Sequence, residues 1–79
     1  MEYIKLNGSE KQIAWAEDIR RKTVEYQTRK HGAIEEMKPN RKAGMLILTQ
    51  KISSAAWWID HRFGFEMVLR DAIAEFGNK

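Results

Sequence analysis

Apolar residues recur at helical spacing along most of the chain, and this pattern constrains the fold more than any other feature. Its clearest stretch has steps of four, three, four and four residues, a spacing that places the side chains on one face of an α-helix. A central helix is therefore predicted over residues 41–63, capped by Asn40 and closed by Gly64. A strand remains an alternative for residues 44–49, because a short apolar run cannot be assigned by period alone. The residues of the stretch are Leu48, Ile52, Ala55, Ile59 and Phe63.

A first helix is predicted over residues 10–30 from signals at both of its ends. Ser9 and Gln12 have the spacing of a capping box, in which each side chain bonds the backbone amide of the other residue. Gly32 follows the cationic residue Lys30, as is common where a helix ends. The buried stripe of this helix is expected to comprise Ile13, Ala16, Ile19 and Thr23.

A third, shorter helix is predicted over residues 65–76, ending before Gly77. Residues 33–40 form a connector, because Pro39 disfavours helical angles in the residue before it. Residues 3–6 are expected to be extended and to lie across the helices. The sequence thus predicts an all-α fold, a compact three-helix domain of residues 1–79 with an extended N-terminal segment. The third helix should turn inward Val68 or Leu69, Ala72, Ile73 and Phe76.

Length and composition argue against an enzyme. A chain of 79 residues buries only about 60% of its unfolded surface, which leaves little for an enclosed catalytic pocket beyond one core. No nucleophile–base pair, phosphate loop or paired carboxylates can be assembled from the sequence. With no cysteine and only His31 and His61 as histidines, no metal site is expected. Each histidine is expected to be a solvated residue at a helix end, and no catalytic residue and no cofactor are predicted.

The apolar runs are too short for a membrane span. Residues 45–48 and 55–59 fall far below the roughly 18 apolar residues that a spanning helix needs. Residues 1–6 have neither a basic region nor an apolar region typical of a secretory signal. A cytoplasmic protein without a membrane association is therefore expected.

Positive charge is concentrated in the middle of the chain. Residues 20–42 hold eight basic and three acidic residues, a net charge of +5, whereas the rest of the chain carries −2. Some of these cations have acidic neighbours four residues away and are explained as ordinary helix pairs. Five of them have no obvious local acid, and we call these five the basic belt: Arg20, Lys30, Lys38, Arg41 and Lys42.

The basic belt has two interpretations. Arg41 and Lys42 fall in the first turn of the predicted central helix, where the helix dipole repels positive charge, so helix stability does not explain them. Free amides and cations at a helix start can bind a phosphate or an acidic surface. The alternative is an indifferent cluster of solvated cations.

Three tryptophans provide the largest apolar side chains. Trp15 and the pair Trp57 and Trp58 are expected to form the contact between the first two helices. Adjacent residues on a helix point about 100° apart, so both members of the pair cannot lie at the centre of one interface. Trp58 is thus a candidate aromatic anchor for a partner, and its alternative place is over the edge of the core.

Two blocks of sequence resemble small bacterial proteins associated with phages and plasmids, most of which are uncharacterised. The blocks are LNGSEKQIAWAEDIR at residues 6–20 and AAWWIDHR at residues 55–62. They are similar to the patterns GSEKQ, WAE and IR early in those proteins and to a W/F-W-I-D and R pattern late in them. His61 stands where asparagine is more usual. The resemblance implies a mobile-element setting and no particular chemistry.

These observations together predict a non-enzymatic accessory protein of a mobile element that binds a host or phage macromolecule through the basic belt and exposed aromatic residues. The partner would be a protein or a ribonucleoprotein, and inhibition of a nucleic-acid-targeting defence complex is one such task. The alternative is direct, sequence-nonspecific binding of nucleic acid, because the predicted helices offer no clear recognition helix. Homo-oligomerisation is compatible with either function.

Overall fold

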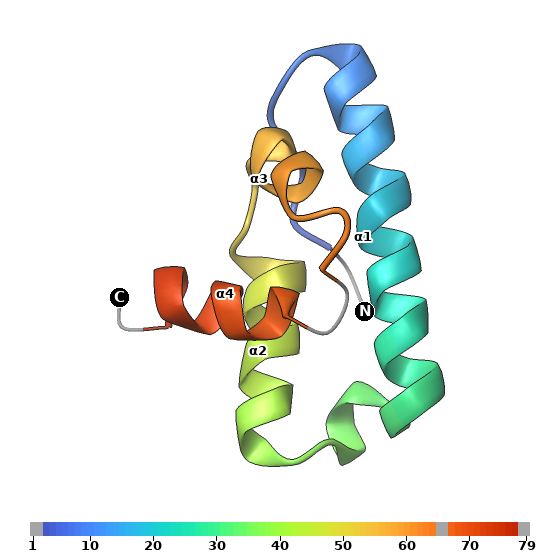
Figure 1. Ribbon diagram of the computed structural model, residues 1–79, viewed down its shortest axis with the longest axis vertical. Coiled ribbons are helices and arrows are strands. Elements are labelled where there is room, and N and C mark those ends of the chain that lie inside the picture. The colour runs from blue at the N-terminus through green and yellow to red at the C-terminus, as the bar shows by residue number, and fades with distance from the viewer. Residues whose placement is uncertain (1–2, 65–66, 78–79) are drawn as a thin grey trace.

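The computed structural model describes residues 3–64 and 67–77, and in these residues it confirms the all-α fold (Figure 1). α1 packs mainly against α3, and α2 packs mainly against α4, which crosses it. Between them lies the core, to which every helix and the N-terminal segment contribute. The elements are α1 (Glu10–His31), the 3₁₀ turn η1 (Ile34–Glu36), α2 (Pro39–Gln50), α3 (Ala55–Asp60) and α4 (Val68–Phe76).

The first helix follows its predicted signals closely. Gln12 donates its backbone amide to the Ser9 hydroxyl at 3.2 Å, and its side chain accepts the Ser9 amide at 3.0 Å, so the capping box is confirmed. Gly32 ends the helix with a φ of 85°, a conformation that favours glycine. With 22 residues, α1 is about 33 Å long. It therefore runs along the whole 34 Å length of the molecule (Figure 1).

The prediction of a single central helix over residues 41–63 is wrong, because residues 51–54 between α2 and α3 are not helical. Near this break, the N-terminal segment forms hydrogen bonds with the backbone of residues 49–55. Asn7 donates to the Ser53 carbonyl at 2.7 Å and accepts from the Ala55 amide at 3.0 Å. Ile4 likewise donates to the Thr49 carbonyl at 2.8 Å. Hydrogen bonds to a segment some 45 residues away in sequence thus replace the helical ladder, which apolar periodicity alone cannot reveal.

The ends of these two shorter helices also differ from expectation. α2 begins with Pro39 in its first turn and Lys38 as its cap residue, so Asn40 is not the cap. Proline suits this position because its missing N–H has no helical partner there. α3 is capped by Ser54, whose hydroxyl accepts the Trp57 amide at 3.2 Å. Residues 44–49 are helical, so the strand alternative is wrong.

The predicted core stripes are largely confirmed. In α1, Ala16, Ile19 and Thr23 are buried and Ile13 packs against the core. The stripe of the predicted central helix holds except at its end, where Phe63 is 87% exposed.

The last helix crosses α2 closely because Gly44 has no side chain. A Cβ at that position would lie 2.9 Å from the Leu69 side chain. In α4, Val68, Leu69 and Ala72 are buried as predicted, whereas Ile73 is partly exposed. The predicted start of this helix at residues 65–66 lies outside the described residues.

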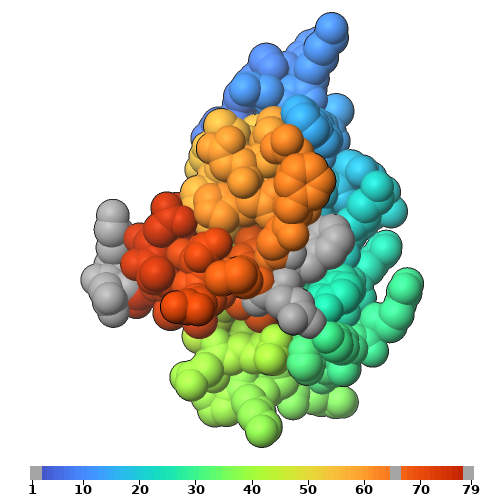
Figure 2. All heavy atoms as spheres, viewed as in Figure 1, coloured from blue at the N-terminus to red at the C-terminus, as the bar shows by residue number. Residues whose placement is uncertain are grey.

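The N-terminal segment lies across the helices, as predicted, and its residue Leu6 is buried in the core. In the all-atom view, α3 and the turn after it lie beside the first half of α1, and the end of α1, η1 and the start of α2 form the lower end of the molecule (Figure 2). No helix among the described residues has the length and apolarity needed to cross a bilayer.

Candidate functional site: a basic end and an aromatic groove

Four of the five predicted belt residues lie at the end of the molecule where α1 stops and α2 starts. Lys30 is in the last turn of α1, Lys38 is the cap residue of α2, and Arg41 and Lys42 are in its first turn. Arg41 lines one surface hollow with Lys30 and another with Lys38. The fold thus brings together cations up to 12 residues apart, and we call Lys30, Lys38, Arg41 and Lys42 the basic end.

The cations of the basic end differ in how they are held. Arg41 donates to the side-chain oxygen of the buried Gln27 at 3.0 Å, which fixes its guanidinium against α1. Lys30 donates to the Tyr26 hydroxyl at 3.0 Å and lies over its ring. Among the described residues, Lys38, Arg41 and Lys42 form no ion pair. Their charge is therefore not neutralised within the described fold.

The backbone at this end adds hydrogen-bond donors. Lys38 makes no side-chain cap to α2, and Pro39 has no N–H. The amides of Asn40 and Arg41 are consequently without helical acceptors, as expected in a first turn. A hollow of about 460 Å³ opens here beside Lys38. A second hollow includes Glu36, so one carboxylate lies at the edge of the positive surface.

The fifth belt residue, Arg20, is not part of this surface, and its prediction as a binding residue is not supported by its position. Only 6% of the residue is exposed, because the N-terminal segment lies over it. Its guanidinium donates to the Ile4 carbonyl at 2.7 Å and lies 4.9 Å from the centroid of the Tyr3 ring. Burial lowers the pKa of the Arg20 guanidinium. Arg20 thus holds the N-terminal segment on α1.

The position of Trp58 does not support its prediction as an aromatic anchor either, because the residue is 0% exposed. It packs edge to face against Trp57, with ring centroids 5.6 Å apart, and both lie in the core. Trp15 is the exposed tryptophan among the described residues, at 49%, although it was expected in the helix contact. The exposed tryptophan is therefore on α1 and not on α3.

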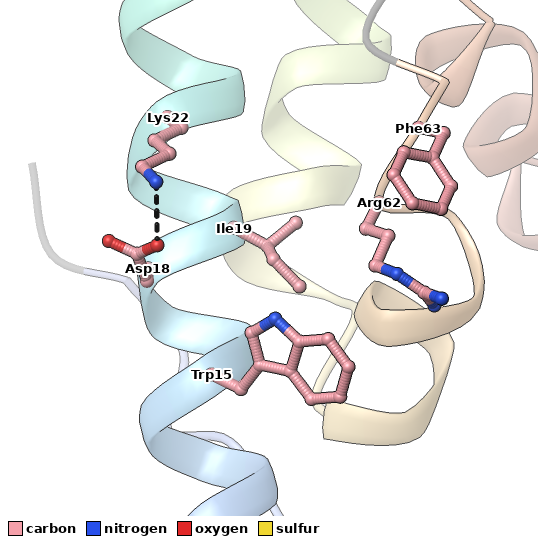
Figure 3. A pocket seen from close by; sticks show the side chains of 6 residues that line it. All are labelled: Trp15, Asp18, Ile19, Lys22, Arg62 and Phe63. Carbon is pink, nitrogen blue, oxygen red and sulfur yellow. Dashed lines mark ion pairs between the residues drawn. The ribbon is translucent and has the colours of Figure 1, made fainter.

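Trp15 forms one wall of a surface groove of about 400 Å³ between α1 and the turn after α3 (Figure 3). The Arg62 guanidinium lies between the rings of Trp15 and Phe63, 5.2 Å and 4.6 Å from their centroids. It also donates to the Ile59 carbonyl at 2.6 Å. We call this the Trp15 groove; it is lined by Trp15, Asp18, Ile19, Lys22, Arg62 and Phe63.

The charges around the Trp15 groove favour an anionic ligand. Asp18 is its one acidic lining residue, and it is paired with Lys22 at 3.0 Å and with Arg21. The hydrogen bond from Lys22 is the largest influence lowering the pKa of Asp18, and the one from Arg21 acts in the same direction, so this carboxylate stays ionised and engaged. Within the described part of the chain, Arg62 has no ion pair. Its positive charge remains uncompensated.

His61 contributes to the contact between α3 and α4. His61 is half-buried rather than solvated, because its ring stacks on Trp57 at 3.9 Å and its Nε2 lies 3.7 Å from both Asp71 and Glu75. The Trp57 indole also donates to Glu75 at 2.9 Å. This cluster joins α3 to α4. Among residues 3–64 and 67–77, no three acidic or histidine side chains lie close enough together to hold a metal ion.

Comparisons of the chain with protein-family models, with curated proteins and with solved structures each found no match.

Proposed function

We propose that this chain is a non-enzymatic binding protein that attaches to a negatively charged macromolecule, and that the macromolecule is nucleic acid, free or within a ribonucleoprotein. The observation that carries the proposal is the basic end, where Lys38, Arg41 and Lys42, which form no ion pair with described residues, lie at the uncapped start of α2. Phosphate oxygens accept hydrogen bonds from lysine, arginine and backbone amides alike. This surface offers all three kinds of donor in one place.

The shape of the surface favours backbone contact over sequence reading. The cations of the basic end come from the end of α1 and the start of α2, and not from one continuous helix face of the kind that enters a major groove. Contacts to phosphate position a protein on nucleic acid without specifying sequence. Binding is therefore sequence-nonspecific.

The resemblance to phage- and plasmid-associated proteins gives this activity a setting. An accessory protein of a mobile element would act in the cytoplasm and would cover or compete for the RNA of a nucleic-acid-targeting defence complex. An acidic surface that imitates DNA is not required for that mode of inhibition. The proposal therefore assigns the inhibitory role to the basic end.

Salt dependence tests the proposal. Binding of a fluorescently labelled single strand of about 16 nucleotides, a length within known site sizes, is measured by anisotropy at rising salt. If the four cations of the basic end contact phosphates, the logarithm of the binding constant should fall against the logarithm of salt with a slope of about −3. Absence of binding at low salt, or binding that does not change with salt, would contradict the proposal and direct the search to protein partners.

A further inference from the structure

We propose that the Trp15 groove holds unpaired nucleobases, so that the preferred ligand of this protein is a single strand rather than a duplex. The inference rests on the proposed function, which concerns the basic end, and it names the class of nucleic acid. Its basis is the juxtaposition of two exposed rings, one unneutralised guanidinium and a lysine in a single groove.

The rings of the groove are available for stacking. Trp15 and Phe63 are 49% and 87% exposed, although large aromatic side chains are normally buried in a domain of this size. Arg62 lies beside both, which places the ring centroids within about 10 Å of each other. Its hydrogen bond to Ile59 fixes it to the end of α3. Aromatic and arginine side chains of this kind are the usual platforms for unstacked bases.

The charge of the groove selects the ligand further. Arg62 carries the uncompensated positive charge of the groove and lies between its two exposed rings, whereas Lys22 on the opposite side is paired with Asp18 (Figure 3). A ligand that presents flat rings and a negative charge at each unit matches both features. A single-stranded nucleic acid is such a ligand, whereas a duplex keeps its base faces stacked inside the helix.

A track along α1 connects the groove to the basic end. Trp15, Lys22, Tyr26 and Lys30 follow one another at steps of seven, four and four residues. At about 100° per residue they lie within about 80° of one another around the helix axis. The 15 residue steps from Trp15 to Lys30 span roughly 22 Å. One strand can thus lie along α1, with bases at the groove and phosphates at the basic end.

The test compares a single strand with a duplex. Wild-type protein is titrated with a thymidine oligomer of about 16 nucleotides, with the uridine oligomer of equal length, and with a DNA duplex of the same length. Single strands should bind about tenfold more tightly than the duplex. Trp15→Ala and Phe63→Ala should each reduce the affinity for single strands about tenfold and leave duplex binding unchanged, whereas Trp15→Phe should retain most of the affinity.

Intrinsic fluorescence gives an independent readout, because Trp57 and Trp58 are buried and Trp15 is exposed. Saturating oligomer should quench the wild-type emission and should not quench that of Trp15→Phe. Leu46→Ala, which removes an exposed apolar side chain on α2, is the control and should bind like wild type. Equal affinity for strand and duplex, or unchanged binding by Trp15→Ala, would overturn this inference while leaving salt-dependent binding intact. If the wild-type protein bound neither single strands nor the duplex at low salt, the proposed function itself would be overturned.

Discussion

Replacing Trp58 with alanine should lower the free energy of unfolding by about 3 to 5 kcal/mol. The side chain is completely buried, and it packs against Trp57 within the core to which every helix contributes. A domain of this length has a total stability of only about 4 to 12 kcal/mol, so the variant should be largely unfolded or close to it. Urea unfolding followed by circular dichroism measures the change.

Trp15→Ala is the matched control for that substitution. It removes the same side chain from the same kind of element, but from a half-exposed position on α1. Its free energy of unfolding should stay within about 1.5 kcal/mol of the parent, because little buried area is lost. If both variants lost stability equally, the assignment of Trp58 to the core and of Trp15 to the surface would be wrong.

The double variant Lys38→Glu/Lys42→Glu should bind single-stranded nucleic acid about 100-fold more weakly than wild type, since two charged hydrogen bonds of about 1.5 kcal/mol each are lost. Its salt slope should become shallower by about 1.4. These two lysines are preferred to Arg41, because that residue holds the buried Gln27 and its loss would disturb the fold. Negative charge near the start of α2 is favourable to the helix dipole, so stability should be retained.

Lys5→Glu/Lys51→Glu changes the net charge of the chain by the same amount on exposed residues outside the basic end. This control should weaken binding only slightly at physiological salt, where charges more than about 8 Å from a phosphate are screened. A loss as large as that of the Lys38 and Lys42 reversal would mean that overall charge, and not the basic end, causes binding.

Local signals in the sequence predicted the helix ends that depend on neighbouring residues. The capping box at Ser9 and the glycine end at Gly32 both involve contacts within one turn, and both are present. The break between α2 and α3 was missed because its cause is distant: the backbone around Ser53 bonds to Asn7. Ser54 followed by Ala-Ala-Trp was the available signal, since serine is a common helix cap.

Charge counting found the basic end but could not separate surface from interior. Arg20 has no acidic residue four positions away, which made it resemble the other cations, yet it donates to a backbone carbonyl of the N-terminal segment. The apolar spacing likewise could not decide which of the two adjacent tryptophans, Trp57 or Trp58, is exposed. In the structure both are in the core.

The Trp15 groove was not predictable from sequence patterns. Arg62 and Phe63 are more than 40 residues from Trp15, and they meet it only because the short α3 packs against the first half of α1. The apolar spacing assigned Phe63 to the core as the last member of a helical stripe. The helix instead ends at Asp60, and the turn that follows carries Phe63 to the surface.

A titration of isotopically labelled protein with a single strand of about 16 nucleotides, followed by amide and indole NMR shifts, tests the binding surface most directly. The largest changes should fall on the amides of Lys38 and residues 40–42 and on the indole N–H of Trp15. The amides near Asp71 and Glu75, which face His61, should change little. Changes centred on α4, or no changes at low salt, would contradict nucleic-acid binding by the basic end and the Trp15 groove.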